Sequence, residues 1–325
     1  MDDQLFEKRT DLTRISAAIG QVRSEVGKIV VGQQDMIDLL LAAILADGHV
    51  LIEGVPGVAK TLTAKLLART IAVNFSRIQF TPDLMPSDVL GTSVFNPKTS
   101  EFTFKSGPVF SNIVLIDEIN RAPAKTQSAL FEVMEERQVT IDGISHKMEK
   151  PFMVLATQNP VEQEGTYRLP EAQLDRFLFK INVDYPELEE EISILEGFHS
   201  RKGINDINEV RPILSPADIE EFRTLVRSIH IDAHLLKYIA QIVTHTRTNS
   251  SLYLGASPRA SLAILSAAKA FAVMQGRDFV TPDDIQRVAV PVLHHRVMLT
   301  PEKEMEGATT QEVIQLIIKN IEIPR

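Results

Sequence analysis

Residues 49–61 read HVLIEGVPGVAKT, and this order predicts a strand, a glycine-rich loop and the beginning of a helix. The short apolar run at 49–52 is typical of a buried parallel strand, and apolar residues return to helical spacing over 60–72. Between them, the glycines of residues 54–61 allow backbone N–H groups to turn toward an anion, while the helix N-terminus adds its positive end. The stretch therefore predicts a phosphate-binding P-loop.

Two side chains at the end of this loop carry the expected chemistry. Lys60 would reach the β- and γ-phosphates of a nucleotide, and Thr61 would bind Mg²⁺ through its hydroxyl. Ala59 stands where a second glycine is usual, and we expect it to adopt helical backbone angles, which alanine tolerates. The alternative is a glycine-rich turn with a solvated lysine, and the order of strand, loop and helix argues against it.

The same alternation of strand and helix recurs along the first half of the chain. Apolar runs at 113–116, 152–156 and 177–183 predict further buried strands, and helical spacing over 4–29 and 33–46 predicts two helices before the first strand. Strands that alternate with helices favour an α/β fold, with a mostly parallel sheet flanked by helices. Active sites in such sheets lie at the carboxyl ends of the strands.

Acidic and amide side chains follow two of these strands. Asp117 and Glu118 directly follow the apolar run at 113–116. Neighbouring carboxylates repel each other unless a cation or a proton intervenes. Mg²⁺ bound by Asp117 would relieve that repulsion, and Glu118 would activate the attacking water. The alternative is a pair of solvated acids. Asn159 follows the next strand and could hydrogen-bond the γ-phosphate and the same water, although a turn-forming Asn before Pro160 is the simpler interpretation when it is taken alone.

Two arginines are further candidates. Arg176 directly precedes the strand at 177–183 and could serve the nucleotide of a neighbouring subunit as an arginine finger, or form an ion pair with Asp175. Arg259 takes the second helical position after Ser257 and a proline, where a cation opposes the helix dipole by about 0.3–1 kcal/mol. That position favours an arginine that faces phosphate oxygens, and an exposed ion pair is the alternative.

Segments 92–106 and 138–147 alternate around polar turns and predict β-hairpins. They are either surface hairpins without a role or projecting insertions that contact a partner, and the sequence favours neither. Their charges are nearly balanced, with two lysines against one glutamate in the first and one lysine against one aspartate in the second. A nucleic-acid-binding loop is expected to carry more positive charge than either hairpin does.

After residue 186 the strand patterns stop. Residues 187–325 carry helical patterns whose start signals place a capping hydroxyl before a proline, at Ser215-Pro216, Ser257-Pro258 and Thr281-Pro282. We therefore predict an α/β domain at 1–186 and an all-helical domain at 187–325.

Composition excludes several classes of site. The 43 acidic residues outnumber the 34 basic ones, so the overall field does not favour nucleic acid. The chain has no cysteine, which excludes disulfides, thiolate zinc sites and cysteine nucleophiles. No apolar run reaches the roughly 18 residues of a membrane span, and the acidic N-terminus is unlike a secretory signal. We expect a soluble, cytoplasmic protein.

Six segments, in this order, resemble the AAA+ ATPases and, within them, the MoxR family, relatives of the AAA+ subunit of magnesium chelatase. The segments are GVPGVAKT (54–61), LIDEINRAP (115–123), EVMEERQV (132–139), ATQNP (156–160), LPEAQLDRF (169–177) and GASPRA (255–260). In that family alanine before the loop lysine is ordinary. The resemblance implies an AAA+ P-loop NTPase core with β-hairpin insertions at 1–186, and a C-terminal helical lid at 187–325.

The resemblance also assigns roles by position. It implies Walker A at Lys60 and Thr61, Walker B at Asp117 and Glu118, sensor 1 at Asn159, the arginine finger at Arg176 and sensor 2 at Arg259. It implies contacts with ATP from Val30, Val31, Gly54, Val55, Pro56, Gly57, Val58, Ala59, Lys60, Thr61, Leu62 and Asp117. Thr61 and Asp117 would hold Mg²⁺. The segment at 92–106 matches the helix-2 insertion, and that at 138–147 matches the hairpin before sensor 1.

Proteins of this kind form nucleotide-dependent rings, usually hexamers, in which these hairpins face the axis. The resemblance therefore implies a homo-oligomer, with a protein that carries a von Willebrand A (VWA) domain as its typical partner. It further implies a chaperone-like role in remodelling or maturing partner proteins. A nucleotide-gated scaffold with slow ATP hydrolysis remains open as an alternative. A nucleic-acid motor is a third, and the hairpin charges argue against it.

Overall fold

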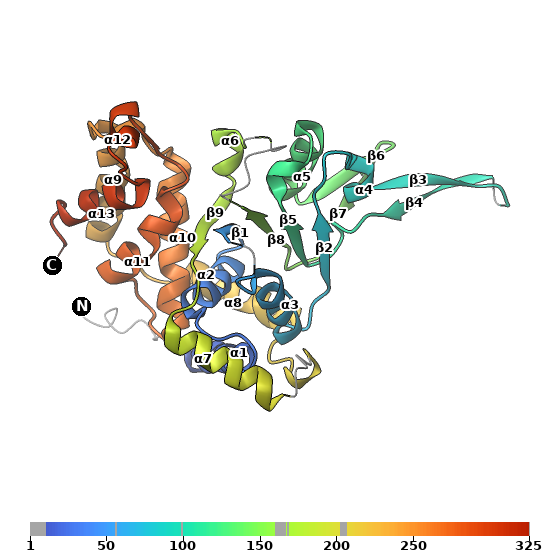
Figure 1. Cartoon of the computed structure of the whole chain (residues 1–325), viewed down its shortest axis with the longest axis horizontal. Helices are drawn as coiled ribbons and strands as arrows, with labels where there is room; N and C mark the ends of the chain where they lie inside the picture. The colour runs from blue at the N-terminus through green and yellow to red at the C-terminus, as the bar shows by residue number, and fades with distance from the viewer. Residues whose placement is uncertain are drawn as a thin grey trace, which may run out of the picture. The chain divides into compact units, whose positions relative to one another are not determined.

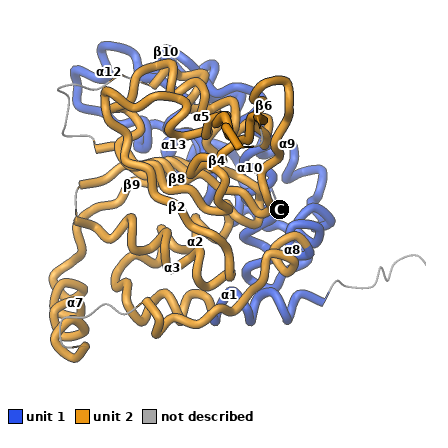
Figure 2. Tube along the Cα trace, turned by 90° about the vertical axis from the view of Figure 1, so that its right-hand side faces the viewer, with its two compact units in different colours: residues 1–21, 221–325 blue, residues 22–220 orange. Residues whose placement is uncertain are grey.

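The computed structural model of the chain describes residues 11–55, 57–98, 100–159, 167, 169–201 and 207–324. The chain forms two compact units, one of residues 22–220 and the other of residues 1–21 together with 221–325 (Figure 2). The chain passes from one unit to the other within α1 (Thr13–Gly27) and again within α8 (Pro216–Ser228).

The unit of residues 22–220 is built on a five-stranded, wholly parallel sheet with the strand order β2-β5-β8-β1-β9 (Figure 1). Its strands are β1 (His49–Gly54), β2 (Phe75–Gln79), β5 (Ile113–Asp117), β8 (Met153–Gln158) and β9 (Phe177–Val183). Four of them confirm the predicted apolar runs. The sequence analysis missed β2, because its residues are mostly polar or partly exposed and form no continuous apolar run.

Helices cover both faces of this sheet. The predicted helices α2 (Gln34–Leu45) and α3 (Lys60–Thr70) are confirmed and lie on one face, whereas α5 (Ala124–Glu136) lies on the other (Figures 1 and 2). The unit also contains α4 (Pro86–Leu90), α6 (Glu171–Leu174), α7 (Leu188–Ser200) and 3-10 turns at Ile119–Arg121 and Ile207–Glu209. The layered α/β class predicted from the sequence is therefore confirmed.

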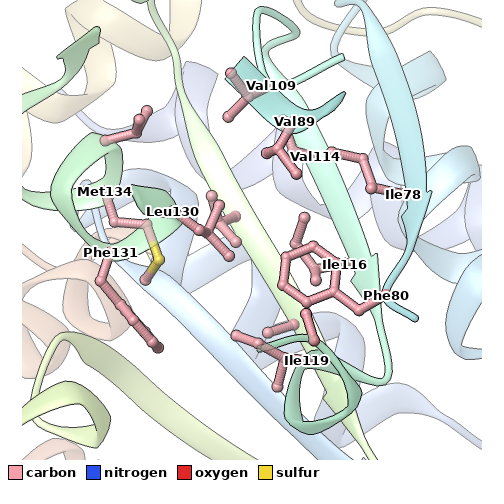
Figure 3. Close-up of a cluster of buried hydrophobic side chains, with 14 of the residues drawn as sticks. Ile78, Phe80, Val89, Val109, Val114, Ile116, Ile119, Leu130, Phe131 and Met134 are labelled. Atoms are coloured by element: carbon pink, nitrogen blue, oxygen red, sulfur yellow. The ribbon is translucent and has the colours of Figure 1, made fainter. Parts of the chain in front are cut away.

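An apolar core packs between the sheet and α5 (Figure 3). Strand β5 contributes Val114 and Ile116, and α5 contributes Leu130, Phe131 and Met134, all of them buried. Burial of each large apolar side chain contributes about 1.5–3 kcal/mol. This core fixes the carboxyl end of β5, where the acidic pair begins.

Two β-hairpins confirm the predictions at 92–106 and 138–147. They consist of β3 (Gly91–Asn96) with β4 (Glu101–Ser106), and of β6 (Gln138–Ile141) with β7 (Ile144–Lys147). The β3–β4 hairpin extends well away from the sheet (Figure 1). The ring of Phe104 stacks on His146 of the second hairpin, with 4.2 Å between centroids. The two hairpins therefore pack against each other.

The unit of residues 1–21 and 221–325 is mainly helical. Its further helices are α9 (Ala233–Thr248), α10 (Pro258–Met274), α11 (Pro282–Leu293), α12 (Pro301–Met305) and α13 (Thr310–Lys319). The predicted starts of α8, α10 and α11 at prolines are confirmed. It is not all-helical as expected, because β10 (Leu252–Leu254) and β11 (Met298–Leu299) pair as an antiparallel ladder too short to show as alternation in the sequence. No helix in the described ranges combines the length and hydropathy needed to cross a membrane.

The compact units divide at residues 220 and 221, later than the predicted domain boundary at 186/187. Hydrogen bonds attach the intervening chain to α3. Arg69 Nε donates to the carbonyl of Val210 at 2.6 Å, and the N–H groups of Ile213 and Leu214 donate to the carbonyl of Thr70 at 2.7 and 3.0 Å. The compact units therefore do not coincide with the predicted domains, and the division into a nucleotide-binding core at 1–186 and a lid at 187–325 stays a prediction.

Candidate functional site

The glycine-rich loop of residues 54–61 joins the carboxyl end of β1 to the first turn of α3. Gly54 allows a close approach, since a Cβ atom there would lie 2.6 Å from the carbonyl oxygen of Val183 on β9. Gly57 has a φ of +91°, which residues with a side chain rarely adopt. Pro56, one of the predicted nucleotide contacts, lies outside the described residues. The path of the loop is therefore set by backbone geometry at two glycines.

The backbone of Ala59 differs from the sequence-based prediction. Its backbone is left-handed, with φ 56° and ψ 17°, rather than helical. The prediction of helical angles was wrong because Ala59 is the residue before α3, which begins at Lys60, and the turn from the loop into the helix imposes another conformation. A left-handed backbone costs a residue with a Cβ atom roughly 1–2 kcal/mol, and glycine avoids this cost. This explains why glycine is usual at this position of such loops. Ala59 therefore holds backbone strain directly before the lysine.

The side chain of Lys60 folds back over the loop and donates from Nζ to the carbonyl of Gly54 at 2.6 Å. Burial lowers the pKa of Lys60, and the negative charges of Asp117 and Glu118 partly offset that shift. The lysine is therefore within electrostatic range of both acids. Among the other predicted contacts of the loop, Val58 is buried, and Val55, Thr61 and Leu62 are half-buried.

Asp117 ends β5 as a buried carboxylate, and both of its oxygens have protein partners. Nε of Arg77 on β2 lies 2.5 Å from Oδ2, and Oγ1 of Thr157 on β8 donates to Oδ1 at 3.1 Å. A buried carboxylate needs such partners because water no longer solvates it. The charge repulsion expected within the acidic pair is thus relieved in part by an arginine of the protein itself.

Glu118 is held by three neighbours. Its Oε2 accepts a hydrogen bond from Nε2 of Gln79 at 2.8 Å and lies 3.0 Å from Nε of Arg121. Its backbone N–H donates to Oγ1 of Thr157 at 3.1 Å. The backbone of Glu118 is left-handed, with φ 58° and ψ 53°, a strain that persists only where the surroundings impose it. The carboxylate is about one-third exposed, so it is oriented and still reachable.

Asn159 directly follows β8, which lies between β5 and β1 in the sheet. The last register pair between β1 and β8 joins Glu53 to Gln158, the residues before Gly54 and Asn159. The predicted convergence of the strand ends is therefore confirmed for the glycine-rich loop, the acidic pair and Asn159.

Arg176 directly precedes β9 and has a partner within the chain. Its Nε lies 2.6 Å from Oε2 of Glu135 on α5, and its guanidinium lies over the ring of Phe131, 5.8 Å from the centroid. The sequence analysis had considered Asp175 as the ion-pair partner. The pair is partly exposed, so it contributes little to stability and leaves the arginine able to move.

Val30 and Val31, two of the predicted contacts with ATP, lie between α1 and α2. Val30 is buried and Val31 half-buried. Gly32 follows with a φ of +77°, and a Cβ atom there would lie 2.5 Å from the carboxyl carbon of Glu190 on α7. The first turn of α7 therefore packs against this segment.

Arg259 takes the second position of α10, as the sequence predicts, and its side chain is exposed. It belongs to the other compact unit. Its approach to a nucleotide phosphate therefore stays a prediction.

Four residues of this network were not assigned roles from the sequence: Arg77, Gln79, Arg121 and Thr157. Arg77 and Gln79 alternate on β2, so they lie on one face of a strand that pairs with β5 through the register Gln79 to Asp117. Recognition of β2 as a strand would have pointed to both residues.

Comparisons with known proteins agree with this geometry. A model of the ATPase family associated with various cellular activities (AAA) matches residues 49–179, and a model of the AAA lid domain matches residues 244–317. The chain is 45% identical over 310 residues to the protein named Chaperone MoxR1 of Mycobacterium tuberculosis, covering 93% of this chain and 81% of that one. The chain belongs to the MoxR family of AAA+ ATPases.

Other relatives of this MoxR-family chain support the same assignment. It is 47% identical over 306 residues to the uncharacterized protein YeaC of Bacillus subtilis, covering 94% of this chain and 95% of that one. The crystal structure of a protein from Cytophaga hutchinsonii superposes with a TM-score of 0.89 at 45% identity, over 97% of each chain. The AAA+ fold with a helical lid domain is thereby shown.

The residues at the sheet edge fit the nucleotide chemistry of this family. A half-buried ammonium at Lys60 is suited to phosphate oxygens, and the loop before it has the left-handed positions at which successive N–H groups converge. The hydroxyl of Thr61 and the carboxylate of Asp117 are hard oxygen donors of the kind that Mg²⁺ prefers.

Proposed function

We propose that this protein binds and hydrolyses ATP with Mg²⁺ and uses the cycle to remodel or mature partner proteins. One observation carries the proposal. The glycine-rich loop with Lys60 and the acidic pair of Asp117 and Glu118 lie at the same edge of a parallel sheet, close enough for both acids to influence the pKa of the lysine. This combines a cation for phosphates with carboxylates for a metal and a water molecule.

Each residue has a role in this proposal. Lys60 binds the β- and γ-phosphates, and Thr61 and Asp117 hold Mg²⁺, which neutralises charge on the phosphates when bound. Glu118 accepts a proton from the attacking water. Asn159 orients that water from the end of β8 as a neutral hydrogen-bonding group. Val30 and Val31 contact the adenine base.

Arg176 and Arg259 would complete the site. We propose that Arg176, which is partly exposed and paired with Glu135, moves to the nucleotide of a neighbouring subunit. We also propose that Arg259, at the second position of α10, contacts the phosphates. This role for Arg176 requires a homo-oligomer, and we propose a ring, hexameric when nucleotide is bound.

The partner proteins are inferred from relatives rather than from the site. The name Chaperone MoxR1 of a relative 45% identical supports a chaperone-like role. We propose a protein with a VWA domain as the partner, and we propose that nucleic acid is not the target. A cytoplasmic location fits this assignment.

One observation favours a second candidate function, a nucleotide-gated scaffold with slow hydrolysis. Gln79 and Arg121 both hold the carboxylate of Glu118. A carboxylate oxygen that is already held by two donors is not free to contact a water molecule, so basal hydrolysis is expected to be slow until a partner releases Glu118.

Parallel measurements of ATP binding and hydrolysis test the proposal. In Glu118→Gln we expect hydrolysis to fall by about 10²- to 10⁴-fold while ATP binding persists, because only the proton acceptor is lost. Unchanged hydrolysis in that variant would contradict the role of Glu118.

The role of Arg176 needs mixed assemblies. Arg176→Ala subunits retain Glu118, and Glu118→Gln subunits retain Arg176, so mixing them restores complete sites if the arginine acts across the interface. We expect ATP hydrolysis to recover on mixing. No recovery in confirmed mixed oligomers would show that Arg176 does not serve the neighbouring site.

A further inference from the structure

Arg77 makes an ion pair with the carboxylate proposed to hold the metal. Its Nε lies 2.5 Å from Oδ2 of Asp117, while Thr157 donates to the other oxygen at 3.1 Å. The exposures of the two partners differ sharply, at 54% for the side chain of Arg77 and 11% for that of Asp117. The acid is fixed in the core, whereas the arginine reaches it from the solvent side.

A buried carboxylate is stable as an ion only while a positive charge or several hydrogen bonds compensate for lost water. Arg77 supplies that charge. A metal ion bound at the same carboxylate supplies it as well, and two cations within a few ångströms of one another repel. Binding of a metal at Asp117 and retention of the Arg77 ion pair therefore oppose each other.

The geometry gives Arg77 a way to leave. An exposed arginine can keep its stem on the protein surface and move its guanidinium into water. Asp117 has no comparable freedom, because it ends a strand buried on both sides and is held by Thr157. The exchange thus requires movement of the arginine alone.

We propose that Arg77 is the counter-ion of Asp117 until a metal ion binds, and that its displacement sets the concentration of divalent metal at which the site is loaded. This inference rests on the proposed function, since it takes Asp117 as a metal ligand. It makes Arg77 a positioning residue that acts through Asp117 and is not required to touch the nucleotide.

Metal binding in the presence of saturating ADP tests the proposal, with Mn²⁺ as the probe and free Mn²⁺ counted by electron paramagnetic resonance. Arg77→Gln keeps a hydrogen-bond donor beside Asp117 and removes the charge, and we expect the half-saturating Mn²⁺ concentration to fall about threefold to fivefold. Arg77→Lys retains the charge and is expected to bind Mn²⁺ like the wild type. Arg77→Ala is a second neutral variant if the Gln variant does not fold.

Arg23→Ala is the matched control, because Arg23 makes a similar pair with Asp38, at 2.6 Å from Nε to Oδ1, between α1 and α2. Its Mn²⁺ affinity is expected to equal that of the wild type. An unchanged or higher half-saturating Mn²⁺ concentration in both neutral Arg77 variants, with ADP still bound, would overturn this proposal alone. Failure of the wild-type protein to bind ADP at all would overturn the proposed function together with it.

Discussion

The glycine-rich loop and the acidic end of β5 lie at one sheet edge but are held in different ways. The loop owes its path to backbone geometry at Gly54, Gly57 and Ala59, and its lysine bonds to a carbonyl of the loop itself. The acidic pair is held by side chains from β2 and β8 and from the turn after β5. Local chain geometry thus determines the first region, and contacts between distant residues determine the second.

The difference has a consequence for substitutions. A side-chain change in the loop is expected to alter nucleotide binding with little effect on folding. A change in the network around the acids is expected to alter stability as well, because several buried groups share the same partners.

The largest effect is expected for Lys60→Ala. Removal of the ammonium loses charge-assisted hydrogen bonds to phosphate, which weakens ATP binding by about 10- to 150-fold. Titration with a fluorescent ATP analogue measures this, and the urea midpoint of the unliganded protein is expected to change little. A large loss of stability without nucleotide would show that the lysine is also a structural element of the loop.

The lowered pKa of Lys60 predicts that ATP affinity and the stability of the unliganded protein both depend on pH. The Lys60 ammonium loses its proton at a lower pH than an exposed lysine does, near 10.5. ATP affinity is therefore expected to fall below that pH, as the pH rises. Unliganded stability moves the other way: the folded state binds fewer protons there than the unfolded state, so stability rises with pH across that interval. Lys60→Arg stays charged, and an identical alkaline decline in that variant would assign the effect to another group.

In the acidic region, Thr157→Val is expected to reduce the free energy of unfolding by about 1–3 kcal/mol. The variant removes one hydroxyl that both donates to Asp117 and accepts from the N–H of Glu118, and it leaves both groups without that partner. Urea unfolding followed by circular dichroism measures the change. Thr63→Val is a control on α3, because the hydroxyl of Thr63 donates to the backbone carbonyl of Ala59 rather than to a buried charge, and it is expected to cost less. Equal losses in both variants would contradict the shared network.

The smallest effect is expected for Ala59→Gly. Glycine relieves the left-handed strain, but it also increases the freedom of the unfolded chain, so the free energy of unfolding is expected to rise by about 1 kcal/mol or less. Thermal unfolding without nucleotide measures this. A destabilised variant would indicate that contacts of the Ala59 methyl group outweigh the strain.

Much of the site could be predicted from the sequence because its signals are local. A short apolar run, a glycine-rich turn and a helical pattern adjoin one another at residues 49–72, and the acidic pair directly follows a buried strand. Parallel strands then bring these carboxyl ends to one edge, which the structure confirms.

The partners of the acids could not be predicted in the same way. Arg77 and Gln79 lie about 40 positions from the residues they contact, on a strand whose polar residues hide its pattern. The left-handed backbone of Ala59 also escaped prediction, since alanine favours helical angles and only the tight connection from β1 to α3 imposes the other conformation.

The most direct test of the account is the rate of ATP hydrolysis per subunit as a function of protein concentration, for the wild type beside Glu118→Gln, with oligomer mass measured with and without ATP. We expect a wild-type rate per subunit that climbs with concentration as oligomers form, and a variant that binds ATP and assembles but does not hydrolyse it. A rate that is independent of concentration and equal in the two proteins would contradict the account.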